Sequence, residues 1–100
     1  MQLTDYHFIQ QIAKLPFVDA IYLFGSRARG DHRERSDIDL AILCPNASER
    51  DWQTIMNIIE DADTLLPIDC LRLDHEQPSS PLRIQIEKDK KLVYERPIKY

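Results

Sequence analysis

One spacing constrains this chain more than any other feature: a Gly25-Ser26 pair, ten further residues, and then Asp37-x-Asp39. The residues just before the pair, 20–24, form a short apolar run rich in strand-forming side chains that stops at the glycine. Over 36–43, apolar residues alternate with the two aspartates, which is the pattern of a half-buried strand. The spacing therefore predicts two strands, with the Gly-Ser pair ending the first and both carboxylates on the second.

The two aspartates are placed to share a cation. Side chains on a strand alternate between faces and rise about 3.3 Å per residue, so Asp37 and Asp39 point the same way with Cα atoms about 6.6 Å apart. Without a metal the two carboxylates repel each other, and one tends to hold a proton near neutral pH. Mg²⁺ is the expected ion, because it prefers hard oxygen ligands and binds a few carboxylates together with substrate phosphates.

The Gly-Ser pair supplies the matching features for a phosphate. Gly25 allows the backbone to turn closely where the strand ends. The Ser26 hydroxyl and the backbone N–H groups that follow, at the start of a short helix, would face an anion with the favourable end of the helix dipole. The pattern therefore sets a phosphate-binding turn beside a metal-binding carboxylate pair.

These residues resemble a known family. The pattern Gly25-Ser26-x10-Asp37-x-Asp39 resembles the DNA polymerase β-like nucleotidyltransferase superfamily, and Gly-Ser-Arg-Ala-Arg-Gly followed by Ser-Asp-Ile-Asp-Leu looks like its minimal, MntA-type branch. Members carry a third acidic residue on the next strand, for which Asp69 is the candidate here and Asp74 the fallback. Arg29 matches an arginine that is typical of the family motif, which makes it a nucleotide-binding candidate with Gly25 and Ser26.

The resemblance implies an α/β (α+β) fold of the polymerase β-like type: a small mixed sheet of three core strands plus an edge strand, flanked by helices. It also implies that Asp37, Asp39 and Asp69 hold two Mg²⁺ ions and catalyse nucleotidyl transfer from ATP. In the branch it resembles, the partner is a HEPN-family ribonuclease toxin, and the small nucleotidyltransferase is the antitoxin that adds AMP to a tyrosine of that toxin. The leading expectation is therefore a protein adenylyltransferase. The alternatives are a non-catalytic nucleotide-binding antitoxin that neutralises the toxin sterically, and the catalytic subunit of a small-molecule nucleotidyltransferase.

Composition limits the other possibilities. With 100 residues, 43% of them hydrophobic, we expect a single domain over 1–100, which the resemblance implies is a minimal nucleotidyltransferase domain. We expect a cytoplasmic protein with no membrane contact, because the chain has neither an apolar span nor a signal-like start. The net charge of −4 weighs against direct nucleic-acid binding, which normally needs a basic face. Cys44 and Cys70 have no metal-ligand spacing, so we expect reduced buried thiols.

Helices and strands alternate along the expected fold. In chain order, the expected elements are a helix capped by Thr4 or Asp5 and stopped by Pro16, a strand at 20–24, a short helix from Ser26, a strand at 36–43, a helix opened by Ser48-x-x-Asp51 and running to about Leu65, a strand at 67–73, a helix from Ser80-Pro81 to about Lys90, and an edge strand at 91–95. Leu82, Ile84 and Ile86 alternate as in a strand, but the Ser-Pro start and the family resemblance favour a helix.

Overall fold

The computed structural model describes residues 3–97. Its elements, in chain order, are η1 (Leu3–Asp5), α1 (His7–Ala13), β1 (Ala20–Phe24), α2 (Ser26–Arg29), β2 (Ile38–Leu43), α3 (Glu49–Glu60), β3 (Ile68–Arg72), η2 (Leu73–His75), α4 (Pro81–Asp89) and β4 (Lys91–Glu95). All four predicted strands and all four predicted helices are present. Within the described range, no helix has the length and apolar character needed to cross a membrane.

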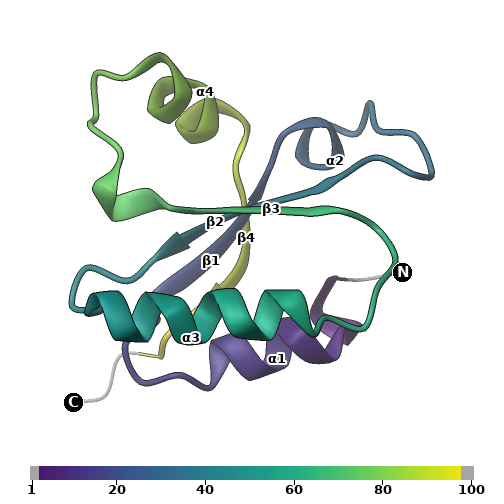
Figure 1. The fold of residues 1–100 in the computed structure, drawn as a ribbon. Helices are drawn as coiled ribbons and strands as arrows, with labels where there is room; N and C mark the ends of the chain where they lie inside the picture. The colour runs from purple at the N-terminus through teal and green to yellow at the C-terminus, as the bar shows by residue number, and fades with distance from the viewer. Residues whose placement is uncertain (1–2, 98–100) are drawn as a thin grey trace.

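The four strands form one mixed sheet in the order β3-β2-β1-β4. β1 is antiparallel to both β2 and β4, whereas β2 and β3 run parallel because α3 connects them as a crossover. Figure 1 shows the sheet nearly edge-on, with α1 and α3 on one face and α2 and α4 on the other. The predicted fold class, a small mixed sheet flanked by helices, is confirmed.

The main core lies between the sheet and the α1/α3 layer. Ile38, Leu40 and Ile42 alternate along β2 toward this layer and are buried, as the period of two in the sequence predicts. They pack against apolar side chains of α1 and against Ile55 of α3. This packing holds β2 in one register, so the intervening residues of the strand are directed to the opposite face.

The opposite face carries a smaller core and the polar residues of the central strands. Ala41 of β2, Leu73 and Ile86 of α4 are buried there, with Tyr22 and Phe24 of β1 packed against them. α4 covers only part of this face. Asp39 lies two positions before Ala41 on the same strand and therefore shares this face, at the end of the sheet near α2.

The start of α1 differs from the prediction. Neither Thr4 nor Asp5 caps the helix: both lie in η1, and the N-cap is Tyr6, which makes no side-chain cap hydrogen bond. The Asp63 carboxylate caps the helix instead, accepting hydrogen bonds from the backbone N–H groups of His7 and Phe8 at 3.1 and 3.2 Å. A local pattern of residues could not reveal this cap, because Asp63 is 55 or more positions away in the sequence.

The α3 helix begins as predicted and ends earlier. Ser48 and Asp51 form a capping box in which each side chain accepts a hydrogen bond from the backbone of the other. The helix ends at Glu60 rather than near Leu65, whose side chain is fully exposed. The earlier end leaves Asp63 in a loop, where it can reach α1.

The last predicted helix is confirmed, although its apolar residues alternate as in a strand. Ser80 accepts a hydrogen bond from the N–H of Arg83, and Pro81 occupies the first turn, so the start of α4 follows the predicted Ser-Pro signal. Ile86 is buried while Ile84 is 57% exposed, which a helix permits because residues two apart lie on different sides.

Candidate functional site

Three carboxylates meet at one end of the sheet. Asp37, Asp39 and Asp69 each offer an oxygen atom within 4.8 Å of the others. The parallel pairing of β2 and β3 sets Asp39 directly beside Asp69. Asp37 was predicted on the same strand as Asp39 but directly precedes β2, and its carboxylate still joins the other two. The structure thus brings together the predicted pair, Asp37 and Asp39, and the predicted third residue, Asp69. Asp37 and Asp69 are exposed and Asp39 is partly buried.

The three carboxylates of the cluster repel one another. The pKa of Asp39 is raised above its usual value, first by burial and then by the negative charges of Asp69 and Asp37. The positive charges of Arg29 and Arg27 act against this rise, so both arginines lie close enough to influence the cluster. A group of this kind gains stability when a cation binds.

The donor set suits a hard divalent cation. All three side chains are carboxylates, and among residues 3–97 none of them forms an ion pair with a lysine, arginine or histidine. Mg²⁺ prefers such oxygen ligands and usually keeps positions for substrate phosphates. The residues therefore fit the metal that the sequence predicts.

Gly25 lies so close to the acidic cluster that a side chain would not fit there. Its φ of 74° and ψ of −158° belong to a region that is essentially limited to glycine. A Cβ at this position would overlap the Asp39 carboxylate, because Phe24 and Asp39 are paired across β1 and β2. The glycine therefore allows the chain to turn from β1 into α2 directly beside the acidic cluster.

Ser26 begins α2, so the predicted turn from strand to helix is present. The helix is a single turn. The N–H groups of Ala28 and Arg29 both bond to the carbonyl of Gly25 at 3.1 Å, so these two donors are used within the turn. Ser26 is partly exposed, and its hydroxyl is the polar side-chain group that the turn contributes next to Gly25.

The basic residues between the two halves of the pattern have different environments. Arg27 donates to the carbonyls of Ser36 and Glu34 at 2.8–3.1 Å, so its guanidinium ties the loop before β2 to α2. Arg33 and Arg35 are exposed. Arg27 thus has a structural partner, which the charge pattern of the sequence could not indicate.

Arg29, the arginine singled out in the sequence, is paired with two carboxylates. Its Nε lies 3.2 Å from Asp31 and its Nη1 lies 3.1 Å from Asp89. Asp89 belongs to the last turn of α4 and also accepts a hydrogen bond from Gln85 at 2.6 Å. Asp89 could not be identified from the sequence, because no local pattern connects positions that are 60 residues apart.

Asp74, the fallback for the third acidic residue, lies elsewhere. Its carboxylate accepts hydrogen bonds from the N–H of Cys44 and from Arg72, both at 2.8 Å. Arg72 in turn donates to the carbonyls of Cys44 and Ala47. Asp74 is therefore part of a structural pair at the far ends of β2 and β3, and Asp69 is the residue that joins the cluster.

One known family matches nearly the whole chain. The model of the family described as Polymerase beta, Nucleotidyltransferase matches residues 7–99. A comparison with curated protein sequences gives no match.

Solved structures share the fold. A toxin–antitoxin crystal structure with AMP-PNP matches with a TM-score of 0.65 and 22% identity, over 89% of this chain and 72% of the other. A mutant of the MntA-HpeT toxin–antitoxin matches with a TM-score of 0.62 and 22% identity, over 88% of this chain and 70% of the other. A candidate nucleotidyltransferase from Sulfolobus solfataricus matches with a TM-score of 0.57 and 25% identity, over 89% of this chain and 75% of the other.

Proposed function

The chain belongs to the polymerase beta nucleotidyltransferase family, and we propose that it is an antitoxin that transfers AMP from ATP to a tyrosine of a HEPN-family ribonuclease toxin. The observation that carries this proposal is the convergence of Asp37, Asp39 and Asp69 within 4.8 Å, beside the Gly25-Ser26 turn. The two toxin–antitoxin structures with the same fold support the choice of partner. Cytoplasmic ATP would supply the nucleotide, and the two free thiols are consistent with a reducing compartment.

In this proposal each residue has one task. Asp37, Asp39 and Asp69 would hold Mg²⁺, two ions in the mechanism that the resemblance implies, and the bound metal would neutralise charge and lower the pKa of the acceptor hydroxyl. Ser26 donates a hydrogen bond to the terminal phosphates, and Gly25 lets the nucleotide approach the backbone. Arg29 offsets the remaining negative charge. The acceptor hydroxyl gives up its proton to solvent, and its oxygen forms a bond to the α-phosphorus as the bond to pyrophosphate breaks. Positioning and charge neutralisation therefore determine the rate.

The decisive experiment measures the mass of the partner. The chain is mixed with ATP, Mg²⁺ and the protein encoded beside it, and the partner's intact mass and ribonuclease activity are recorded. We expect a gain of one or more AMP units and a loss of ribonuclease activity. Asp37→Asn, Asp39→Asn and Asp69→Asn should each abolish the gain, because each removes a metal ligand. Asp61→Asn, an exposed residue at the end of α3, is the matched control and should transfer normally.

The two alternatives give different results in the same experiment. A steric antitoxin would protect against the ribonuclease without nucleotide, would do so equally with Asp39→Asn, and would leave the partner's mass unchanged. A small-molecule nucleotidyltransferase would leave both the mass and the ribonuclease activity of the partner unchanged, because its acceptor is absent from the mixture. Either result would contradict the proposed protein adenylyltransferase.

A further inference from the structure

The link between α2 and α4 lies beside the acidic cluster, and its α4 member, Asp89, has no part in the function proposed so far. Arg29 reaches from α2 to Asp89 of α4, and Gln85 holds the same Asp89 oxygen from one turn earlier. The Asp89 side chain is 9% exposed, whereas that of Arg29 is 41% exposed. The carboxylate is therefore the fixed, enclosed member of the pair, and the arginine is the member that solvent can reach. Figure 1 shows α2 and α4 on the same face of the sheet.

The arginine retains unused donors. A guanidinium has five N–H groups. Nε of Arg29 donates to Asp31 and Nη1 donates to Asp89, while Nη2 makes no hydrogen bond to any residue between 3 and 97. Arg27 also keeps one terminal nitrogen, Nη1, without a hydrogen bond among the described residues, but its Nε and Nη2 donate to backbone carbonyls of the loop before β2 rather than to carboxylates. Arg29 is thus oriented on one side and free on the other, as a residue that receives an anion would be.

The position of Arg29 relative to the cluster follows from α2. Arg29 is one helical turn from Gly25, and its N–H bonds to the carbonyl of Gly25, the residue that abuts Asp39. Its charge acts on Asp39. A polyphosphate bound at the carboxylates through a cation would therefore come near a guanidinium whose direction is already set.

We propose that Asp89 is a positioning residue, which holds Arg29 so that its free Nη2 edge meets the polyphosphate of the bound nucleotide. This inference rests on the proposed function. An exposed arginine loses rotamer freedom when it binds an anion, and a carboxylate that fixes the guanidinium beforehand reduces that loss. Asp89 is suited to this because α4 is anchored to the sheet by the buried Ile86, three residues earlier. The pairing across α2 and α4 therefore makes nucleotide affinity depend on a residue that touches no nucleotide.

The test compares ATP with AMP by titration calorimetry in the presence of Mg²⁺. Asp89→Asn keeps the size of the side chain and removes its charge, and we expect ATP to bind about three- to tenfold more weakly, the size expected for one fixed side chain. AMP, which lacks the polyphosphate, should bind within about twofold of wild type. Asp89→Glu, which restores the carboxylate, should recover part of the loss. Glu87→Gln is the matched control on the same helix, because Glu87 pairs with Arg83 and Lys90 rather than with Arg29.

The Arg29→Ala variant distinguishes a positioning role of Asp89 from a purely structural one. In Arg29→Ala, the substitution Asp89→Asn should have no further effect on ATP affinity, because Asp89 acts through Arg29. In the free protein, the ¹⁵N side-chain signal of Arg29 should sharpen toward that of a mobile guanidinium in Asp89→Asn and remain unchanged in Glu87→Gln.

Three results would overturn the inference. They are equal ATP affinity in wild type and Asp89→Asn, an equal loss for ATP and AMP, and an undiminished loss in the Arg29→Ala background. Failure of the proposed transfer is distinguishable, because it leaves the partner's mass unchanged while the effect of Asp89→Asn on ATP affinity persists. Absence of Mg²⁺-dependent ATP binding by the wild type would overturn both.

Discussion

Gly25 is the residue on which the geometry of the acidic cluster depends most directly. We expect Gly25→Ala to lower the free energy of unfolding by about 1–3 kcal/mol through backbone strain, and to displace the Asp39 carboxylate. Mg²⁺-dependent nucleotide binding should be lost with it. Gly30→Ala is the matched control: it also has a positive φ, 85°, but a Cβ there meets nothing within 4 Å. Urea unfolding and ATP titration of both variants check this, and normal ATP binding by Gly25→Ala would contradict it.

Asp39 should destabilise the metal-free protein at neutral pH. Its pKa is raised in the folded state by burial, Asp69 and Asp37, so ionising it costs more in the folded chain than in the unfolded chain. Asp39→Asn should therefore match wild type below the pKa of the unfolded chain and become more stable than wild type as the pH rises through the folded pKa. For a domain of this size, each kcal/mol corresponds to a Tm increase of about 4–8 °C.

Adding Mg²⁺ supplies the complementary measurement. It should raise the Tm of wild type, because the ion binds only the folded state, and should leave Asp39→Asn nearly unchanged. Thermal unfolding from pH 3 to pH 8 with and without Mg²⁺ records both effects. A variant that is less stable than wild type at pH 8 without metal would refute the repulsion argument.

Among the elements, the far ends of β2 and β3 are joined by Arg72 and Asp74. Arg72 is buried and donates to Asp74 and to the carbonyls of Cys44 and Ala47. We expect Arg72→Ala to cost about 3–5 kcal/mol, because it leaves a charge and two carbonyls without their partner. Arg83→Ala, an arginine that is less enclosed, should cost less. Chemical denaturation at pH 7 measures both, and equal losses would contradict the assigned role.

The same pair predicts a pH dependence. Burial alone would raise the pKa of Asp74, but the Cys44 N–H and Arg72 outweigh it and hold the pKa below its usual value. A lowered folded pKa adds stability above the unfolded pKa, and this stability is lost as the pH falls through the folded pKa. Wild type should therefore exceed Asp74→Asn in stability at neutral pH, and the difference should shrink on acidification. Urea midpoints between pH 7 and pH 2.5 test the sign.

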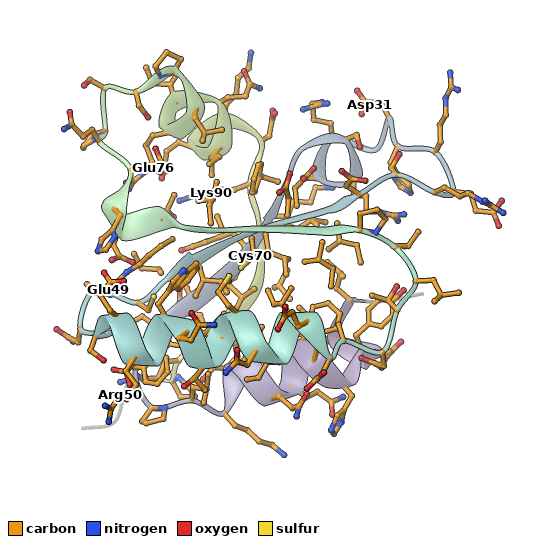
Figure 2. All side chains as sticks on the ribbon, viewed as in Figure 1. Asp31, Glu49, Arg50, Cys70, Glu76 and Lys90 are labelled. Atoms are coloured by element: carbon orange, nitrogen blue, oxygen red, sulfur yellow. The ribbon has the colours of Figure 1, made fainter. Side chains whose placement is uncertain are left out.

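At the scale of the whole molecule, the reactivity of the two cysteines measures how well the main core excludes solvent. Cys44 is fully buried, and Figure 2 shows Cys70 between the sheet and α3. Burial raises the pKa of the Cys44 thiol to about 11 and that of the Cys70 thiol to about 12.

We therefore expect a thiol reagent at pH 8 to react with the native protein roughly a hundredfold or more slowly than with the chain in urea, a factor of ten for each pKa unit. Cys44→Ala and Cys70→Ala each leave one thiol to follow, so the two sites can be compared. Rapid native-state modification of either thiol would show that the α1/α3 layer opens without global unfolding.

Much of this protein can be derived from the sequence because its signals are local. The apolar alternation along 36–43 and the Gly-Ser pair that ends 20–24 predict the two central strands, and the family resemblance adds Asp69. The capping pairs at Ser48 and Ser80 predict the starts of α3 and α4, since a cap involves residues three apart.

Tertiary structure decided what depends on residues far apart in the chain. Asp63 caps α1 in place of the predicted Thr4 or Asp5, Arg29 is paired with Asp89, and Asp74 belongs to Arg72 rather than to the acidic cluster. In each case the partner is chosen by how the layers pack. A carboxylate carries the same charge wherever it lies, and only the packed sheet and helices determine which donor it meets.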